Sequence, residues 1–200
     1  MGVMTSLIAV TLVTAFVSVG ARRLFTSIHA VGVQTFCLAG ICVAGGLESE
    51  GPRLYVAVLT MFLTVKAIAL PVLFRRVVVR LGVSREIDML VGVPGSMLLA
   101  TVLVGAAYAT TRSLNAAEFP RPPGFLAVSV SLVLLGLLIM AIRRKVVTQL
   151  VGLLQMENGA FLAAMTSADG LPVIVDLGVF MDLLIVALLA GVVLHRVRDS

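Results

Sequence analysis

Two acidic residues lie in the middle of long apolar segments in the last third of the chain. Glu157 lies about eleven residues after Val146, where one segment begins, and Asp182 lies a similar distance after Val173, where the next begins. In a helix, eleven residues rise about 16 Å, roughly half the thickness of a bilayer's hydrocarbon core. An acid at that depth costs about 2.5–3.5 kcal/mol on insertion scales. A chain that keeps two of them is expected to use them, and movement of protons or cations is the first hypothesis.

A lysine lies at a comparable depth in an earlier apolar segment. Lys66 is near the middle of the segment Leu54–Phe74, and Pro71 follows within two turns, where it can bend a helix and free a backbone carbonyl. Three interpretations of Lys66 remain open. It takes part in an ion relay tuned by a neighbouring acid, it forms a structural ion pair with Glu157 or Asp182, or it extends toward the cytoplasmic edge of the membrane.

Two more ionisable residues fall inside apolar segments, and both have a local explanation beside a relay role. Asp176 lies about one turn into its expected helix, where an acid interacts favourably with the helix N-terminus. His29 lies near the cytoplasmic end of its expected helix, where a hydrogen bond to nearby backbone is the alternative. Both residues are therefore kept as candidates for the relay beside Glu157, Asp182 and Lys66.

On the expected helix that carries Glu157, the spacing places a glycine packing face and the acid on different sides. Gly152 and Gly159 are seven residues apart and share a face, which allows a neighbouring helix to approach closely. Glu157 falls away from that face, so it is expected to face a different neighbour or a cavity. Both acids have a second interpretation, as packed and hydrogen-bonded structural groups.

The composition is that of a membrane protein with little outside the bilayer. Of the 200 residues, 60% are hydrophobic and 12% are charged, whereas a soluble domain has about 45–50% apolar and about 25% charged residues. The net charge of +5 comes from basic residues that flank the apolar segments, so a lipid bilayer, not a nucleic acid, is the expected partner. We find no space for a soluble catalytic domain and no motif for a metal or cofactor, so the chain alone is not expected to catalyse a reaction.

Seven apolar segments are long enough to cross a bilayer as helices, which predicts an all-α membrane protein with seven transmembrane helices. The segments are Val3–Gly20, Ile28–Leu47, Leu54–Phe74, Leu90–Ala109, Gly124–Ile142, Val146–Met165 and Val173–Leu194. They do not alternate as membrane strands do. The connections between them are short.

Basic residues gather in every second connection, which predicts the orientation. The expected cytoplasmic side holds Arg22, Arg23, Arg75, Arg76, Arg80, Arg85, Arg143, Arg144, Lys145, Arg196 and Arg198, and the other side holds Arg53, Arg112 and Arg121. The N-terminus is therefore expected outside and the C-terminus in the cytoplasm. No basic region precedes the first segment, so we interpret it as a retained helix of a multi-pass protein in the inner (plasma) membrane of the cell.

Three motifs in the last third of the chain resemble a known family. Arg143-Arg144, Leu150-Val-Gly-Leu153 and Met156-Glu-Asn158 resemble the pattern of the small three-helix K subunit of complex I and of the related C subunit of multisubunit cation/proton antiporters. The resemblance covers only the last three helices. It divides the chain into an N-terminal five-helix region, residues 1–142, and a three-helix K-like unit, residues 124–200, which share one helix.

The whole chain, with its additional N-terminal helices, resembles component E of hydrogenase-4. The stretches Met156-Glu-Asn-Gly159 and Asp176-Leu-Gly-Val179, with Asp182 beyond, carry this resemblance. It implies a membrane-arm subunit of a group 4 hydrogenase or of a formate hydrogenlyase-like complex. The implied partners are antiporter-like membrane subunits, a membrane anchor subunit and a soluble hydrogenase-like arm, and nickel-iron and iron–sulfur centres would lie in those partners.

The chain departs from the K-subunit pattern at its acids. The first intramembrane acid of that pattern would fall at Leu154, whereas Glu157 lies one helical turn later, and Asp182 replaces a glutamate. One turn keeps an acid on nearly the same helix face, so the relay role is retained at a shifted depth. Two alternatives are kept: a non-catalytic assembly subunit of a cation/proton antiporter or complex I-like assembly, and an independent small ion transporter.

Overall fold

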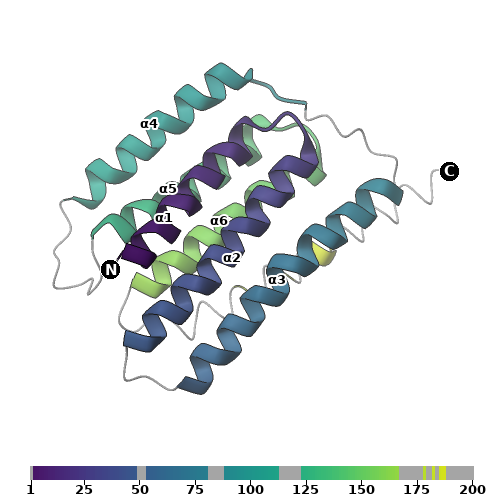
Figure 1. Ribbon diagram of the computed structural model, residues 1–200. Helices are drawn as coiled ribbons and strands as arrows, with labels where there is room; N and C mark the ends of the chain where they lie inside the picture. The colour runs from purple at the N-terminus through teal and green to yellow at the C-terminus, as the bar shows by residue number, and fades with distance from the viewer. Residues whose placement is uncertain are drawn as a thin grey trace.

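The computed structural model describes residues 2–48, 53–80, 88–112, 123–166, 178, 182 and 185–187. These residues form an all-helical protein (Figure 1). The helices are α1 (Gly2–Gly20), α2 (Leu24–Glu48), α3 (Arg53–Arg80), α4 (Val93–Thr111), α5 (Pro123–Ile142) and α6 (Val146–Thr166). Within the described ranges the β-structure is limited to one isolated bridge, between Met89 and Arg143.

Four helices form a closed ring, and one further helix packs on each side of it. The ring runs α1, α2, α6, α5 and back to α1, because each of these neighbours is in contact with the next. Helix α4 packs against α1 and α5, and α3 packs against α2 at the opposite edge, as Figure 1 shows. Helix α6, between α2 and α5 in this ring, has most of its residues buried.

Five helices in the described part of the chain are long and apolar enough to cross a membrane: α1 to α5. Helix α6 has a similar length but carries Gln149, Gln155, Glu157 and Asn158, which lower its hydropathy. This polarity is tolerated because α6 is surrounded by protein. The described residues are therefore all-helical, and the length and composition of five helices indicate a membrane-embedded protein. The count of seven helices and the orientation stay predictions, since most of the segment Val173–Leu194 lies outside the described residues.

Three helix boundaries differ from the sequence prediction by three residues or more, and the first is the start of α2, which is Leu24 and not Ile28. Helix α3 continues six residues past Phe74 to Arg80, because Arg75 and Arg76 are good helix formers that extend beyond the apolar segment. Helix α4 begins at Val93 and not at Leu90, because Pro94 occupies its first turn and the Leu90 amide instead donates to the Ile142 carbonyl at 2.8 Å.

Glycines bring α5 and α6 into backbone contact. A Cβ atom added to Gly152 would lie 2.6 Å from the Gly136 carbonyl oxygen, and one added to Gly159 would lie 2.7 Å from the Val133 nitrogen. A Cβ on Gly136 would meet the backbone of Met156 at 2.6 Å. Any side chain at these positions would force the helices apart, so this interface confirms the expected role of Gly152 and Gly159.

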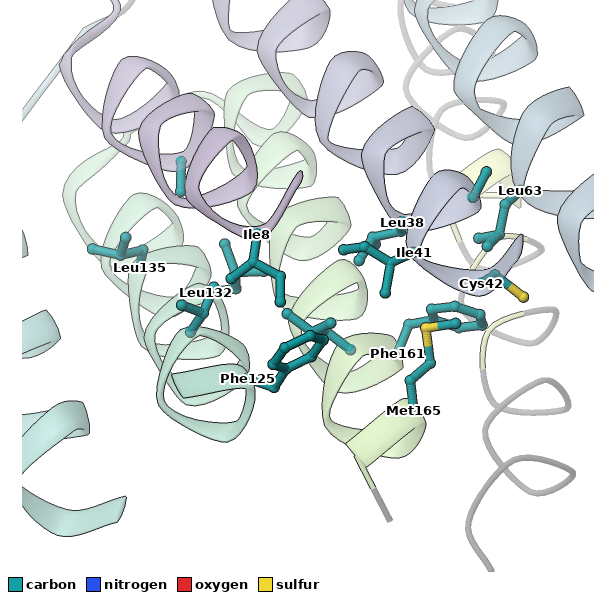
Figure 2. Close-up of a cluster of buried hydrophobic side chains, with 14 of the residues drawn as sticks. Ile8, Leu38, Ile41, Cys42, Leu63, Phe125, Leu132, Leu135, Phe161 and Met165 are labelled. Atoms are coloured by element: carbon teal, nitrogen blue, oxygen red, sulfur yellow. The ribbon is translucent and has the colours of Figure 1, made fainter. Parts of the chain in front are cut away.

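The buried apolar side chains form two clusters, which occupy different heights on the helices that they share, α2, α3 and α6. The first, the ring cluster, includes Ile8, Leu38, Ile41, Cys42, Leu63, Phe125, Leu132, Leu135, Phe161 and Met165, which Figure 2 labels. The second, the basic-end cluster, includes Leu24, Ile28, Val31, Leu70, Phe74, Val77, Leu150, Leu154 and Ile185. Each cluster takes residues from α2, α3 and α6, so the two together hold these helices in register.

Three basic connections meet at one end of the bundle, which we call the basic end. The Arg143 side chain, after α5, contacts Ser18 and Ser27, which flank the turn that carries Arg22 and Arg23. Asp88, before α4, pairs with Lys145 at 3.0 Å. The predicted grouping of basic loops on one side therefore agrees with the described geometry.

Candidate intramembrane ion-pair site

The amine of Lys66 lies between two carboxyl groups. Its Nζ donates a hydrogen bond to Glu157 Oε1 and lies 3.0 Å from Asp182 Oδ1. The side chains of Lys66 and Glu157 are 5% and 7% exposed, and that of Asp182 is 19% exposed. Three segments that are far apart in sequence thus bring three of the five candidate residues into one buried cluster, which we call the ion-pair cluster.

The helix faces explain how α3 and α6 meet at these residues. On α3, Lys66 lies on the same face as the buried Leu63 and Leu70, which turns its amine toward the protein interior. On α6, Glu157 points away from the face that packs on α5, as the positions of Gly152 and Gly159 predicted. The amine therefore ends near its own helix's mid-length, and the interpretation that Lys66 extends to the membrane edge is wrong.

Small residues make room around the cluster. A Cβ atom on Gly178 would lie 3.4 Å from Glu157 Oε1, so that position brings backbone close to the acid. On the other side, a Cβ on Gly32 would lie 3.0 Å from Pro71 Cγ and 3.3 Å from the Ala67 carbonyl oxygen. Proline cannot donate to the carbonyl four residues earlier, which is that of Ala67. The freed carbonyl expected from Pro71 therefore faces α2, and α3 continues through the proline as a helix.

Uncharged polar side chains extend the cluster across the ring. Asn158, next to Glu157, donates from Nδ2 to Gln34 Oε1 and to Thr35 Oγ1, both at 3.1 Å. Gln34 donates in turn to the Thr11 carbonyl at 3.1 Å. Side-chain hydrogen bonds thus link α6 to α2, and the Gln34 side chain links α2 to the backbone of α1. We call Thr11, Gln34, Thr35 and Asn158 the amide network.

Apolar residues seal this polar layer from above and below. On α3, Lys66 lies between Leu63 of the ring cluster and Leu70 of the basic-end cluster. On α6, Glu157 and Asn158 lie between Leu154 and Phe161, which also belong to different clusters. The same alternation holds on α2, where Gln34 and Thr35 separate Val31 from Leu38. The polar groups therefore occupy one layer at about mid-height, inside an otherwise apolar bundle.

Some polar atoms in this layer have no partner in the described part of the chain. Glu157 Oε2 and both amide atoms of Gln155 are buried without a hydrogen bond there. A buried polar group without a partner costs about 1–3 kcal/mol, and a bound water is one way to satisfy it. Glu157 Oε2 belongs to the ion-pair cluster and Gln155 lies at a similar height on the opposite side of α6, so the layer is a candidate path for water.

Of the remaining two candidates, one lies apart from the cluster and the other is outside the described residues. His29 is exposed near the start of α2, and its Nδ1 is 2.6 Å from the Phe25 carbonyl oxygen, which is the local hydrogen bond that the sequence offered as an alternative. Asp176 lies outside the described residues. Within those residues, no three His, Cys, Asp or Glu side chains are grouped as a metal site would require.

Sequence reasoning missed Gln34, Thr35 and Gln155, because it considered only charged residues. A signal was present, since an amide in an apolar membrane segment also needs a partner inside the protein. It also missed the burial of Arg143, which it counted as an ordinary loop arginine. Arg143 is 1% exposed and binds the turn between α1 and α2.

Comparisons with known proteins find a similar protein, but they assign no activity to it. A search against models of known protein families finds no match, and no solved structure is significantly similar. The chain is 29% identical over 178 residues to the uncharacterised protein Rv0085 of Mycobacterium tuberculosis, a match that covers 88% of this chain and 80% of that protein. The extent of the match indicates that the two chains share most of their length.

Proposed function

We propose that this protein is a membrane-arm subunit of a group 4 hydrogenase or formate hydrogenlyase-like complex, and that its ion-pair cluster relays protons or cations. In this proposal the redox centres belong to the partner subunits. Antiporter-like subunits, a membrane anchor subunit and a soluble hydrogenase-like arm with nickel-iron and iron–sulfur centres would be its partners. The motif resemblance of the last three helices supports the complex, and the geometry of the cluster supports the relay.

The observation that carries the relay is one amine held between two carboxyl groups in a sealed layer. With all three groups ionised the cluster has a net charge of −1, and it is neutral when one carboxyl group holds a proton. A proton can therefore reside on either acid while Lys66 stays charged. Because intramembrane acids and bases of this kind pair with one another and line ion paths, the arrangement suits a site that gains and loses one proton per cycle.

The exposures of the two acids suggest the order of exchange. Asp182 is the more exposed acid and Glu157 the more buried one. A proton that arrives at Asp182 can pass by way of the Lys66 amine to Glu157, whose Oε2 atom is unpartnered within the described residues. Release then requires water in the layer that also contains Gln155 and the amide network.

The decisive experiment uses Glu157→Gln and Asp182→Asn in the native complex. We expect each variant to assemble normally and to lower coupled proton transport in membrane vesicles about tenfold or more, because a proton-transfer group is lost. Asp88→Asn is the matched control, since Asp88 is exposed at the basic end and pairs with Lys145. Transport by both cluster variants at the wild-type rate would contradict the relay.

The same variants separate the relay from a purely structural role. A purely structural role predicts that Glu157→Gln reduces the amount of assembled complex in proportion to transport, because the buried Lys66 amine loses one of its two carboxyl partners. Quantifying the complex on native gels distinguishes these results. Co-purification of a nickel-containing partner with the tagged wild-type chain tests the complex itself, independently of the cluster.

A further inference from the structure

The guanidinium of Arg143 is enclosed where three connections meet at the basic end. Arg143 follows directly after α5, and its side chain is among the largest that are fully buried. Its Nη2 atom donates to the Ser18 carbonyl and, at 3.1 Å, to Ser27 Oγ. Ser27 Oγ also donates to the Ser18 carbonyl at 2.9 Å. The arginine thus joins the end of α5 to the turn between α1 and α2.

Two of its three nitrogens have no acceptor in the described parts of the chain. Arg143 Nε and Nη1 are buried there without a hydrogen bond. The ion pairs found in the same residues use other cations, and the nearby Asp88 pairs with Lys145 at 3.0 Å. Burial lowers the pKa of Arg143 to about 10, so the group stays charged at neutral pH.

A buried charge without a counter-ion is unfavourable, so the site calls for an anion. The carbonyl and hydroxyl that bind Nη2 are neutral and leave the positive charge uncompensated. The exposed side chains of Arg22, Arg23 and Arg144 surround the same end and add positive potential. This environment attracts an anion and repels any further cation.

The height of the site in the bundle indicates which anion it binds. Arg143 follows the last residue of the apolar span Gly124–Ile142, the level at which a bilayer presents its phosphate groups. Guanidinium groups bind phosphate through directed, charge-assisted hydrogen bonds, and basic pockets between transmembrane helices bind lipid head groups. We propose that Arg143, oriented by Ser27, binds a phosphate group, supplied by an anionic phospholipid or by free phosphate.

Access to the guanidinium requires movement of the turn before α4. Residues 88–90 cover this region through backbone hydrogen bonds from Leu90 to Ile142, at 2.8 Å, and from Arg144 to Asp88, at 3.3 Å. Asp88 and Leu90 are exposed and are not part of a helix. Because these residues are held to α5 and to the connection after it by two backbone hydrogen bonds, we infer that they can move aside without unfolding α5 or α6.

The test measures thermal unfolding of the purified full-length chain after lipid is removed in a neutral detergent. Phosphatidylglycerol, phosphatidylcholine or inorganic phosphate is added back, and phosphatidylglycerol is expected to raise the unfolding midpoint of the wild type. An equal rise with millimolar inorganic phosphate would identify free phosphate as the source. In Arg143→Gln the rise is expected to disappear, whereas Arg144→Gln, an exposed neighbour, retains it.

A milder variant keeps the test decisive if Arg143→Gln does not fold. Arg143→Lys retains the charge but loses the planar guanidinium, whose N–H donors can bind two phosphate oxygens at once. We therefore expect its affinity for phosphatidylglycerol to fall about tenfold. Absence of any rise in the wild type with either phosphate source would overturn the proposal and indicate a carboxyl group as counter-ion. An undiminished response of Arg143→Gln, or of Arg143→Lys in its place, would also overturn it.

Discussion

Helix α6 has two sides that are held by different forces. Toward α5 it presents Gly152 and Gly159, and the two backbones touch. Toward α3 it presents Glu157, which is held by the Lys66 amine. The first interface depends on shape and the second on charge. The difference shows how one helix can be fixed in place on one side while the other side keeps groups able to exchange a proton.

The two sides also respond differently to water. Backbone contact at glycine leaves no space for solvent and contains no titratable group, so it is insensitive to pH and to the state of the cluster. The α3 side has an unpartnered polar atom at Glu157 Oε2 within the described residues. The closely packed α5–α6 pair therefore provides a fixed frame for the side of α6 that carries Glu157.

The largest loss of stability is expected from a substitution in the glycine contact between α5 and α6. In Gly159→Leu the new Cβ would lie 2.7 Å from Val133 N and 2.8 Å from Leu132 Cβ. Because backbone atoms cannot move aside, we expect a loss of stability above about 5 kcal/mol and no accumulation of folded protein. Gly105→Leu is the matched control, since a Cβ there meets nothing within 4 Å. Normal expression of Gly159→Leu would show that α5 and α6 do not need this contact.

The next largest loss of stability is expected from removing the positive charge of Lys66, which holds the side of α6 that faces α3. Lys66→Met leaves Glu157 and Asp182 facing each other without a cation, which costs about 3–5 kcal/mol in soluble proteins. Thermal unfolding in detergent measures the loss. Combining it with Glu157→Gln and Asp182→Asn is expected to recover most of the stability, because no charge then stays buried. If the combined variant were as unstable as Lys66→Met, charge would not be the cause.

A smaller effect is expected at the amide network between these two sides. Asn158→Ala leaves Gln34 Oε1 and Thr35 Oγ1 without their donor. The expected loss of stability is about 1–3 kcal/mol, with proton transport reduced less than in Glu157→Gln. Urea or thermal unfolding and vesicle transport of the same variant give the two quantities. A transport defect as large as that of Glu157→Gln would place Asn158 in the relay itself.

The smallest effect is expected at His29, whose hydrogen bond stays within its own helix and does not reach α6. Its ring is exposed and bonds the Phe25 carbonyl of its own helix at 2.6 Å. His29→Ala is therefore expected to change stability by less than about 0.5 kcal/mol and to leave transport unchanged. A clear decrease in transport by His29→Ala would restore this residue to the relay.

Much of the fold was predictable, because transmembrane segments must satisfy every backbone group within themselves and so appear as long apolar runs. The predicted ends of α1, α5 and α6 lie within one residue of those observed. The start of α2, the C-terminal end of α3 and the start of α4 were less predictable. They depend on where a helix leaves the apolar environment and on a backbone contact between Leu90 and Ile142 that no local pattern encodes.

By itself the sequence determined which residues carry charge inside apolar segments, and on which face of its helix Glu157 lies relative to Gly152 and Gly159. Helical periodicity and the cost of burying charge suffice for both. Only the tertiary structure decided that Lys66 joins Glu157 and Asp182 while His29 does not, and that Arg143 is buried. Such pairings depend on the relative height and rotation of helices distant in sequence, which are fixed by packing between them.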